Sequence, residues 1–323
     1  HAEPLDEAGV EKVLMDALTA APGHAAENES DFRVSIAGAQ EKTALTWHAG
    51  RWCKPRNATP TTHIFKLPLG LVGHRRADMR TSVENEWLCA QFLRAYGLPI
   101  AECAIQRFGS QKVLVVERFD RRLAASGHYW LRLPQEDLCQ ATGTPSSAKY
   151  ESDGGPGLVD IARVLHGSET RDADLATLLK AQLLFWMLAA TDGHAKNFSL
   201  FLLAGGRYRL TPLYDVLSTW PVVGAGPNHL DRNRLKLAMA LRGRNAHYRL
   251  KDIQRRHFNE TARSCGLGQD MEEIIEDVIA RTAAVTEQVG ARLPSGFPGD
   301  VFQSIAQGLL ASAERLKSDK VSV

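Results

Sequence analysis

The stretch "AATDGHAKNFSLFLLAGGRYRLTPLYDVLS", residues 189–218, places Asp192, Asn197 and Asp215 on a short piece of chain directly after a long apolar run. Its pattern predicts a polar loop followed by a β-hairpin. A packed core has no use for these side chains, because a buried carboxylate is costly unless it is paired, hydrogen-bonded or bound to a metal. A site that holds magnesium and transfers phosphate needs such a set.

The order of these polar residues indicates kinase chemistry. In protein kinases the catalytic Asp precedes an Asn with four residues between them, and a magnesium-binding Asp follows. Asp192 and Asn197 have that spacing, and Asp215 ends the hairpin. We expect Asp192 to act as base or to orient the attacking hydroxyl, Asn197 and Asp215 to bind magnesium, and Lys196 to meet phosphate. The alternative is that Asp192 and Asn197 cap a helix and Asp215 lies in a turn.

The other parts of a kinase site are expected upstream. Residues 34–42, "VSIAGAQEK", read as a small-residue loop between two strands over nucleotide phosphates, although they lack a Walker signature and suit an ordinary hairpin turn as well. Lys66 in "HIFKLP" resembles the strand lysine of kinases, unless it is only a solvated edge residue. Glu86 on the following helix is its candidate partner, with Glu84 as the rival. Backbone groups of "VERF", 116–119, are expected to read adenine.

Hydrophobic periodicity predicts an α+β protein with two lobes. The first, 1–125, is small and rich in strands; the second, 126–323, is larger and mainly helical, and the two join near residues 117–130. Helices are expected at 6–20, 82–97, 175–190, 271–293 and 299–317. Asp6 is the expected N-cap of the first helix and Gly97 the expected C-cap of the second.

Composition narrows the class of protein. The 323 residues are 44% hydrophobic and carry a net charge of +2, which is ordinary for a globular chain. Five scattered cysteines without a C-x-x-C pair argue against a disulfide framework or zinc site and for a reducing compartment. No apolar run reaches the ~18 residues of a membrane helix, and no signal peptide is evident, so we expect a cytoplasmic protein. His1 in place of Met indicates a processed, tagged or truncated chain.

In three further segments, residue spacing alone does not indicate a chemical role. "LPQEDLCQATG" and "YESDGGPG" are polar and glycine-rich, and Gln135, Asp137 and Asp153 within them are either turn formers or functional residues. The segment His229–Arg263 holds ten Lys and Arg against three acidic residues, a balance of 10 − 3 = +7. Such a patch suits nucleic acid or an acidic partner, but a solvated helix face is the favoured interpretation.

With these features in place, the chain resembles the HipA family of bacterial serine/threonine kinase toxins. The matching stretches run in order over nearly the whole chain: "DFRVSIAGAQEKTAL", "TPTTHIFKLP", "VERFDRR", "LRLPQEDLCQ", "PSSAKYESDGGPG", "ATDGHAKNFS", "AGGRYRLTPLYD" and "LKLAMAL". The resemblance implies a two-lobed, protein-kinase-like fold related to lipid kinases, with ATP and Mg²⁺ as cofactors.

The resemblance also implies residue roles. Asp192, with Lys196 and Asn197, would be catalytic; Asn197 and Asp215 would bind the metal, and Ser35 would be autophosphorylated. Phosphate at Ser35 would eject the loop from the nucleotide site and inactivate the enzyme. The implied ATP-binding residues are Ala37, Gly38, Ala39, Gln40, Glu41, Lys42, Lys66, Glu117, Arg118, Phe119, His194 and Tyr214.

Partners follow from the same resemblance. Family members phosphorylate an aminoacyl-tRNA synthetase, glutamyl-tRNA synthetase foremost and tryptophanyl-tRNA synthetase in HipT-like proteins, and so halt translation. A HipB-like helix-turn-helix antitoxin would hold the toxin and reach operator DNA. The resemblance implies that the sequence starts after the N-terminal subdomain of HipA, as expected either for a HipA without that portion or for the short HipT-like form, to which a separate HipS-like protein supplies it. Ala37 in "SIAG" favours HipA. The alternatives are a small-molecule phosphotransferase and a catalytically silent co-repressor.

Overall fold

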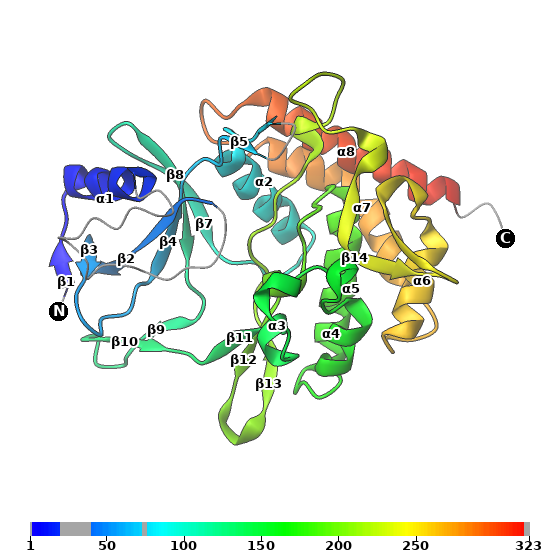
Figure 1. Ribbon diagram of the computed structural model, residues 1–323, viewed down its shortest axis with the longest axis horizontal. Coiled ribbons are helices and arrows are strands. Elements are labelled where there is room, and N and C mark those ends of the chain that lie inside the picture. The colour runs from blue at the N-terminus through cyan, green and yellow to red at the C-terminus, as the bar shows by residue number, and fades with distance from the viewer. Residues whose placement is uncertain (1, 20–39, 73–75, 320–323) are drawn as a thin grey trace. The chain divides into compact units, whose positions relative to one another are not determined.

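The computed structural model describes residues 2–19, 40–72 and 76–319 (Figure 1). The chain divides into two compact units. Unit 1 comprises His1–Val72, Asp78–Trp87 and Ala101–Leu133, and unit 2 comprises Gly73–Ala77, Leu88–Ile100 and Pro134–Val323. Helix α2 (Ser82–Ala95) begins in unit 1 and ends in unit 2. The boundary expected after residue 125 lies before the observed one, which follows Leu133. The expected division also assigned residues 88–100 to the first lobe, whereas they belong to unit 2.

An antiparallel sheet of six strands, in the order β1-β3-β2-β4-β8-β7, forms the body of unit 1. The strands are β1 (Ala2–Pro4), β2 (Lys42–His48), β3 (Arg51–Pro55), β4 (His63–Lys66), β7 (Cys103–Phe108) and β8 (Gln111–Glu117). Short pairs β5–β6 (Leu71–Val72, Ala77–Asp78) and β9–β10 (Arg121–Leu123, Trp130–Arg132) accompany it. Of the two strands expected on either side of the 34–42 loop, the one that follows the loop is confirmed as β2, whereas the one that precedes it lies outside the described residues.

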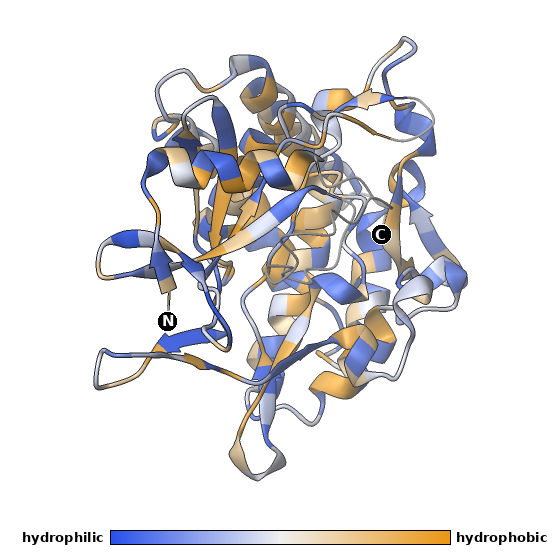
Figure 2. Ribbon diagram, turned by 60° about the vertical axis from the view of Figure 1, so that its left-hand side comes forward, coloured by the Kyte–Doolittle hydropathy of each residue, from blue (hydrophilic) through white to orange (hydrophobic). Residues whose placement is uncertain are grey.

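Helix α1 (Glu7–Thr19) closes one side of the apolar core of unit 1. It begins as expected at Asp6, whose carboxylate accepts a hydrogen bond from the Gly9 amide at 2.8 Å. Val10 and Leu14 are buried against residues of the sheet, among them Phe65. Figure 2 shows apolar residues gathered where the helix faces the strands. Burying each such side chain contributes roughly 1.5–3 kcal/mol, so this contact holds the strand that carries Lys66.

His63 makes the stability of unit 1 depend on pH. Burial lowers the pKa of this imidazole from 6.5 to about 4. Between those values the unfolded chain binds a proton that the folded chain does not, so stability falls as pH drops below about 6.5. We expect the urea midpoint to fall between pH 7 and pH 5 more steeply in the wild-type protein than in a His63→Gln variant. Equal slopes in the two proteins would contradict this assignment.

Unit 2 is built mainly of helices around α5. The helices are α3 (Leu138–Ala141), α4 (Leu158–Leu165), α5 (Arg171–Met187), α6 (Arg255–Ser264), α7 (Glu272–Gly290) and α8 (Gly299–Ser318). Helix α5 is apolar nearly all round and its second half is buried, as expected for a core helix. Two polar side chains inside it donate to backbone carbonyls: the Gln182 amide nitrogen to Met239 at 3.2 Å, and the Trp186 indole to Leu250 at 3.0 Å. The Gln182 amide oxygen is buried without a hydrogen-bond partner among the described residues.

Two sheets complete unit 2. One consists of β11 (Gln135–Asp137), β12 (Ser199–Leu202) and β13 (Tyr208–Leu210), and the other of β14 (Lys236–Arg242) and β15 (Ala246–Arg249). The pair β12–β13 is the hairpin expected in the 189–218 stretch. None of the helices in the described part of the chain has both the length and the hydropathy needed to span a lipid bilayer.

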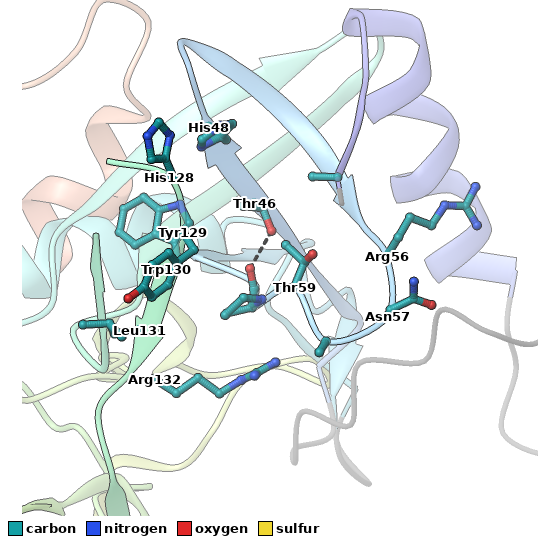
Figure 3. Close-up of a pocket in the computed structure, with 13 residues that line it drawn as sticks. Thr46, His48, Arg56, Asn57, Thr59, His128, Tyr129, Trp130, Leu131 and Arg132 are labelled. Carbon is teal, nitrogen blue, oxygen red and sulfur yellow. Dashed lines mark hydrogen bonds between the residues drawn. The ribbon is translucent and has the colours of Figure 1, made fainter. Parts of the chain in front are cut away.

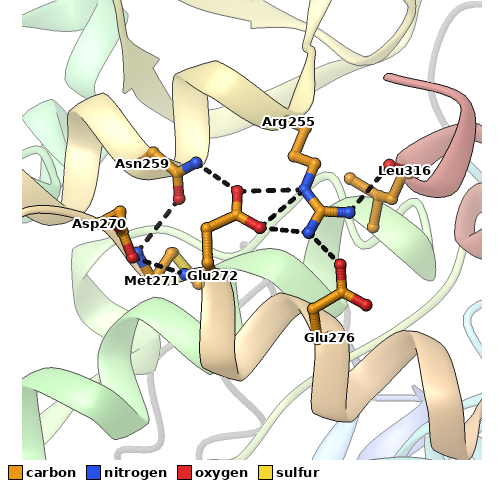
Figure 4. A network of polar contacts seen from close by, with 7 residues as sticks. All are labelled: Arg255, Asn259, Asp270, Met271, Glu272, Glu276 and Leu316. Atoms are coloured by element: carbon orange, nitrogen blue, oxygen red, sulfur yellow. Dashed lines mark hydrogen bonds and ion pairs between the residues drawn. The ribbon is translucent and has the colours of Figure 1, made fainter. Parts of the chain in front are cut away.

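The basic segment His229–Arg263 is mostly not a helix, so the expected solvated helix face is wrong for most of its length. It holds the β14–β15 hairpin, two short 3₁₀ turns and only then α6. Strand β14 is buried from Leu237 to Leu241. Within α6, Arg255 is also buried and joins α7 through Glu272 and Glu276 (Figure 4). The continuous apolar run Leu237–Leu241 forms a buried strand despite the charged residues on either side of it.

Candidate functional site

Lys66 and Glu86 form a buried ion pair in unit 1. Their Nζ and Oε1 atoms lie 2.6 Å apart, and the two residues are 8% and 5% exposed. Lys66 is presented by β4, and Glu86 lies in the second turn of α2. A buried charge is tolerated only when it is paired, so the pair fixes the lysine on the sheet. The expected pairing with Glu86 is confirmed.

Glu84 is not the partner of Lys66. Its carboxylate is paired with Lys112 of β8 through one oxygen, and the other oxygen is buried without a hydrogen-bond partner among the described residues. The two acidic residues of α2 therefore bind two different lysines, because side chains two positions apart lie on different faces of a helix.

The expected phosphate loop is described only from Gln40 onward. Gln40 donates through its side-chain amide to the Leu67 carbonyl at 2.6 Å, and the Glu41 carbonyl accepts from the Leu67 amide at 3.0 Å. Lys42 pairs in register with Lys66 across β2 and β4. These contacts bring the end of the loop next to the lysine. Ser35, Ala37, Gly38 and Ala39 lie outside the described residues.

Two backbone amides of the segment expected to read adenine, residues 116–119, form hydrogen bonds within unit 1. The Glu117 amide donates to the Glu102 carbonyl at 2.8 Å, and the Arg118 amide donates to the Thr62 carbonyl at 2.9 Å. The Arg118 side chain is paired with Asp120. These two N–H groups are therefore structural, and the expectation that they read a base is not supported. Phe119 follows at half-buried exposure.

Unit 1 also contains a cavity of about 770 Å³ (Figure 3). Its lining is Ala2, Thr46, His48, Arg56, Asn57, Ala58, Thr59, Pro60, His128, Tyr129, Trp130, Leu131 and Arg132. The lining carries two arginines and two histidines and no carboxylate, and the Trp130 indole N–H is buried without a hydrogen-bond partner among the described residues. Among the described residues expected at the nucleotide site, none lines this cavity.

In unit 2, hydrogen bonds close the 189–218 stretch at its base. The Thr219 amide and hydroxyl both donate to the Ala189 carbonyl, at 3.0 and 2.8 Å, and the Ser218 hydroxyl donates to the Leu188 carbonyl at 2.5 Å. These hydrogen bonds join the two ends of the stretch. Asp192, near its first residue, and Asp215, near its last, are therefore held in the same region of unit 2. This closure is what the sequence pattern of a loop and a hairpin implied.

One carboxylate oxygen of Asp192 accepts a hydrogen bond, and the other accepts none from any described residue. The Tyr150 hydroxyl donates to Oδ1 at 2.5 Å, whereas Oδ2 lies 3.9 Å from His194 Nε2, too far for a hydrogen bond. The side chain is 67% exposed. It neither caps a helix nor sits in a core, so the helix-cap alternative is wrong for Asp192. An exposed, oriented carboxylate can accept a proton from a bound hydroxyl.

Asn197 offers a buried oxygen with no partner. Its Nδ2 donates to the Asp215 backbone carbonyl at 3.4 Å, and its Oδ1 accepts no hydrogen bond from any described residue. Such an orphan costs free energy unless another group satisfies it. Asp215, with φ of 61°, is held in the left-handed region and is exposed. A strained backbone at a polar residue is typical of functional sites.

These residues fit a magnesium ion. Carboxylate and carboxamide oxygens are the ligands that Mg²⁺ prefers, and it commonly uses one or two protein ligands together with substrate phosphates. Asn197 and Asp215 supply that number. Within the described parts of the chain, no group of three or more His, Cys, Asp or Glu side chains could hold a metal, so the pattern is not that of a cage built by the protein alone.

Of the three other residues expected at the site, Lys196 and Tyr214 have side-chain hydrogen-bond partners within unit 2, whereas a ring nitrogen of His194 has none among the described residues. Lys196 Nζ bonds Asp137 Oδ2 at 2.6 Å, so this lysine is anchored at the end of β11. The Tyr214 hydroxyl donates to the Lys196 carbonyl at 2.8 Å and lies 2.6 Å from Ser199 Oγ. His194 is 5% exposed, and its Nδ1 is buried without a partner among the described residues.

The carboxylates of Asp192 and Asp215 both affect the pKa of His194. Burial lowers the pKa of His194 below its usual range, against the opposing pull of Asp192 and, more weakly, Asp215. Lys149 acts in the same direction as burial. A neutral imidazole therefore lies beside Asp192.

Sequence reasoning missed Tyr150 at this site and left Asp137 open between a turn former and a functional residue. Tyr150 contacts Asp192 directly, and Asp137 both caps α3 and anchors Lys196. Asp137 accepts from the Gln140 amide at 2.9 Å in a capping box, and the spacing D-x-x-Q was visible as a helix start. Nothing local pointed to the contact of Tyr150.

The chain is similar in sequence to several known proteins. Residues 34–286 match the family model described as HipA-like C-terminal domain. "Putative kinase Y4mE" of Sinorhizobium fredii is 38% identical over 217 residues, which cover 67% of this chain and 49% of that protein. "Serine/threonine-protein kinase toxin HipA" of Shewanella oneidensis is 32% identical over 198 residues, covering 58% and 43%. The chain thus spans about half the length of the curated relatives it matches.

A solved complex of HipA and HipB from Shewanella oneidensis with operator DNA contains a similar chain. The TM-score is 0.76 at 22% identity, and the match covers 100% of this chain and 75% of that one. A likeness at that identity shows the fold. The expected α+β fold, with a sheet-rich N-terminal region and a helical C-terminal region, is confirmed.

Proposed function

Because the chain belongs to the family of HipA-like C-terminal domains, we propose that it is an ATP- and Mg²⁺-dependent kinase that phosphorylates protein serine or threonine. The observation that carries the proposal is the buried pair of Lys66 and Glu86, at 2.6 Å. Protein kinases need a strand lysine paired with a helix glutamate for transfer. A silent binding module has no reason to bury such a pair, because apolar residues in its place are often neutral or stabilising.

The residues of unit 2 supply the chemistry in this proposal. Asp192 orients the acceptor hydroxyl through its open oxygen and takes its proton. The acceptor oxygen bonds to the γ-phosphorus, the bond from that phosphorus to the β,γ-bridging oxygen breaks, and ADP leaves. Asn197 and Asp215 hold magnesium, which neutralises phosphate charge when bound. Lys66 binds nucleotide phosphate in unit 1.

We extend the proposal to a toxin role. A relative is named a kinase toxin, and the similar solved chain belongs to a complex with HipB and operator DNA. The function we propose is therefore phosphorylation of an aminoacyl-tRNA synthetase in the cytoplasm, glutamyl-tRNA synthetase before tryptophanyl-tRNA synthetase. A HipB-like antitoxin restrains the kinase, with or without a separate HipS-like protein, and autophosphorylation at Ser35 inactivates it.

Phosphoproteomic mass spectrometry tests this proposal. The purified protein is incubated with ATP, Mg²⁺ and a dephosphorylated bacterial lysate, with the Asp192→Asn variant as the blank. We expect new phosphoserine or phosphothreonine in a synthetase, and phosphate on Ser35 of the protein itself. Consumption of ATP with a metabolite but no labelled protein would indicate a small-molecule phosphotransferase instead. Nucleotide binding without any transfer would overturn the kinase proposal.

A further inference from the structure

The segment from Pro145 to Gly157, which contains "YESDGGPG", folds tightly on itself in unit 2. It holds the 3₁₀ turns η1 (Ser146–Ala148) and η2 (Glu151–Asp153), and Gly154 ends η2 with φ of 90°. A Cβ on Gly155 would lie 2.1 Å from the Ala148 carbonyl oxygen, and one on Gly157 would lie 2.4 Å from the Glu151 carboxyl carbon. The glycines are therefore required by close packing of the segment rather than by flexibility.

Glu151 fastens this segment to strand β14. Its Oε2 accepts from the Ala240 amide at 2.6 Å, and its Oε1 is paired with Arg242. The Glu151 side chain is only 8% exposed, and burial raises the pKa of its carboxyl against the opposing effect of these partners. The neighbouring residue, Tyr150, is thus fixed in space by a rigid turn with a buried anchor.

Tyr150 meets the catalytic loop through both its ring and its hydroxyl. The ring packs edge-on against His194 with centroids 5.3 Å apart, and Lys149 Nζ lies 5.0 Å from the ring centroid. The hydroxyl donates to Asp192 Oδ1 at 2.5 Å. Burial, followed by the Asp192 carboxylate, raises the pKa of the phenol, so the phenol keeps its proton and acts only as a donor at neutral pH.

We propose that Tyr150 is a positioning residue for phosphoryl transfer: its hydroxyl binds Oδ1 of Asp192 and so directs Oδ2 to the acceptor hydroxyl. The inference rests on the proposed kinase function. Asp192 stands on a loop and is 67% exposed, so without this bond its side chain would sample several rotamers. A charge-assisted hydrogen bond from a fixed donor removes that freedom, and fixed geometry at the reacting atoms raises the rate.

A Tyr150→Phe variant tests the inference, with Tyr248→Phe as the matched control. The substitution deletes one oxygen and keeps the ring on His194, and the Tyr248 hydroxyl has no hydrogen-bond partner among the described residues. We expect kcat to fall by about tenfold or more in Tyr150→Phe, with KM for ATP unchanged because the lost bond does not involve nucleotide. The control is expected to keep wild-type kcat.

A double variant separates positioning from a general structural role. In the Asp192→Asn background, adding Tyr150→Phe is expected to cost little further activity, because residues that act as a unit are non-additive. A full second tenfold loss would show a structural role and overturn the inference. So would wild-type kcat in Tyr150→Phe, or a higher kcat, which would mean that the phenol blocks the acceptor site. A wild-type protein that transfers no phosphate would instead overturn the proposed function, and this inference with it.

Discussion

Replacement of Asp192 by asparagine is expected to lower kcat for phosphate transfer by about 10²–10⁴-fold, the usual contribution of a positioned general base. The carboxamide oxygen of asparagine still accepts the Tyr150 hydrogen bond that Oδ1 accepts at 2.5 Å. What is lost is the negative charge and the ability to take the acceptor proton. Because this side chain is 67% exposed, the change removes chemistry without opening a cavity.

The measurement is the initial rate of phosphate incorporation into protein, together with thermal unfolding of the same samples. Asp172→Asn is the matched control, since that side chain is 95% exposed and lies at the start of α5. Both variants are expected to unfold within a few degrees of the wild-type protein, because exposed substitutions change stability by about 0.5 kcal/mol or less. A rate for Asp192→Asn equal to that of the control would remove Asp192 from the mechanism.

The parts of the site that lie close together in sequence could be predicted. Lys66 was found from its place in a short apolar strand, and Glu86 from the following amphipathic helix; the 2.6 Å pair confirms both. Asp192, Asn197 and Asp215 were found from spacing, and the chain closes around them. Local periodicity carries this information because strands and helices present side chains at fixed intervals.

Contacts between distant segments could not be predicted in the same way. Tyr150 lies 42 residues before Asp192, and Asp137 lies 59 residues before Lys196. No pattern in either segment names its partner, since the meeting is set by how the turns and sheets pack. The same limit explains the segment around β14, where local charge suggested a helix surface but burial of the apolar run Leu237–Leu241 decided the structure.

Arg255 is expected to be the residue of unit 2 whose loss costs most stability without touching the chemistry. It is 3% exposed and ties α6 to two neighbouring helices (Figure 4). Its guanidinium binds Glu272 through two nitrogens, pairs with Glu276, and donates to the Leu316 carbonyl at 3.2 Å. The hydrogen bonds that Arg255 donates to Glu272 raise the pKa of the guanidinium, so its charge is permanent.

An Arg255→Met variant is therefore expected to lose about 2–3 kcal/mol of unfolding free energy, because the substitution removes several charge-assisted hydrogen bonds at once. The loss stays below the 3–5 kcal/mol typical of a stranded buried charge, because the Glu272 and Glu276 side chains are 36% and 46% exposed and regain water. Arg255→Lys is expected to recover only part of the loss, because an ammonium lacks the planar fork that binds one carboxylate through two nitrogens.

Urea unfolding followed by tryptophan fluorescence measures this effect, because Trp186 packs against Phe258 of α6 at 5.6 Å between ring centroids. Lys317→Met is the control: Lys317 is 53% exposed and, within the described residues, its only ion pair is with the exposed Glu314, so its loss is expected to cost less than about 0.5 kcal/mol. If Arg255→Met unfolds at the urea concentration of the control, the buried network does not stabilise the fold. Below the unfolding transition the Arg255 variants should keep wild-type kcat. Among the described residues, the hydrogen bonds and ion pairs of the Arg255 side chain go to Glu272, Glu276 and Leu316, and none goes to the proposed catalytic or metal-binding residues.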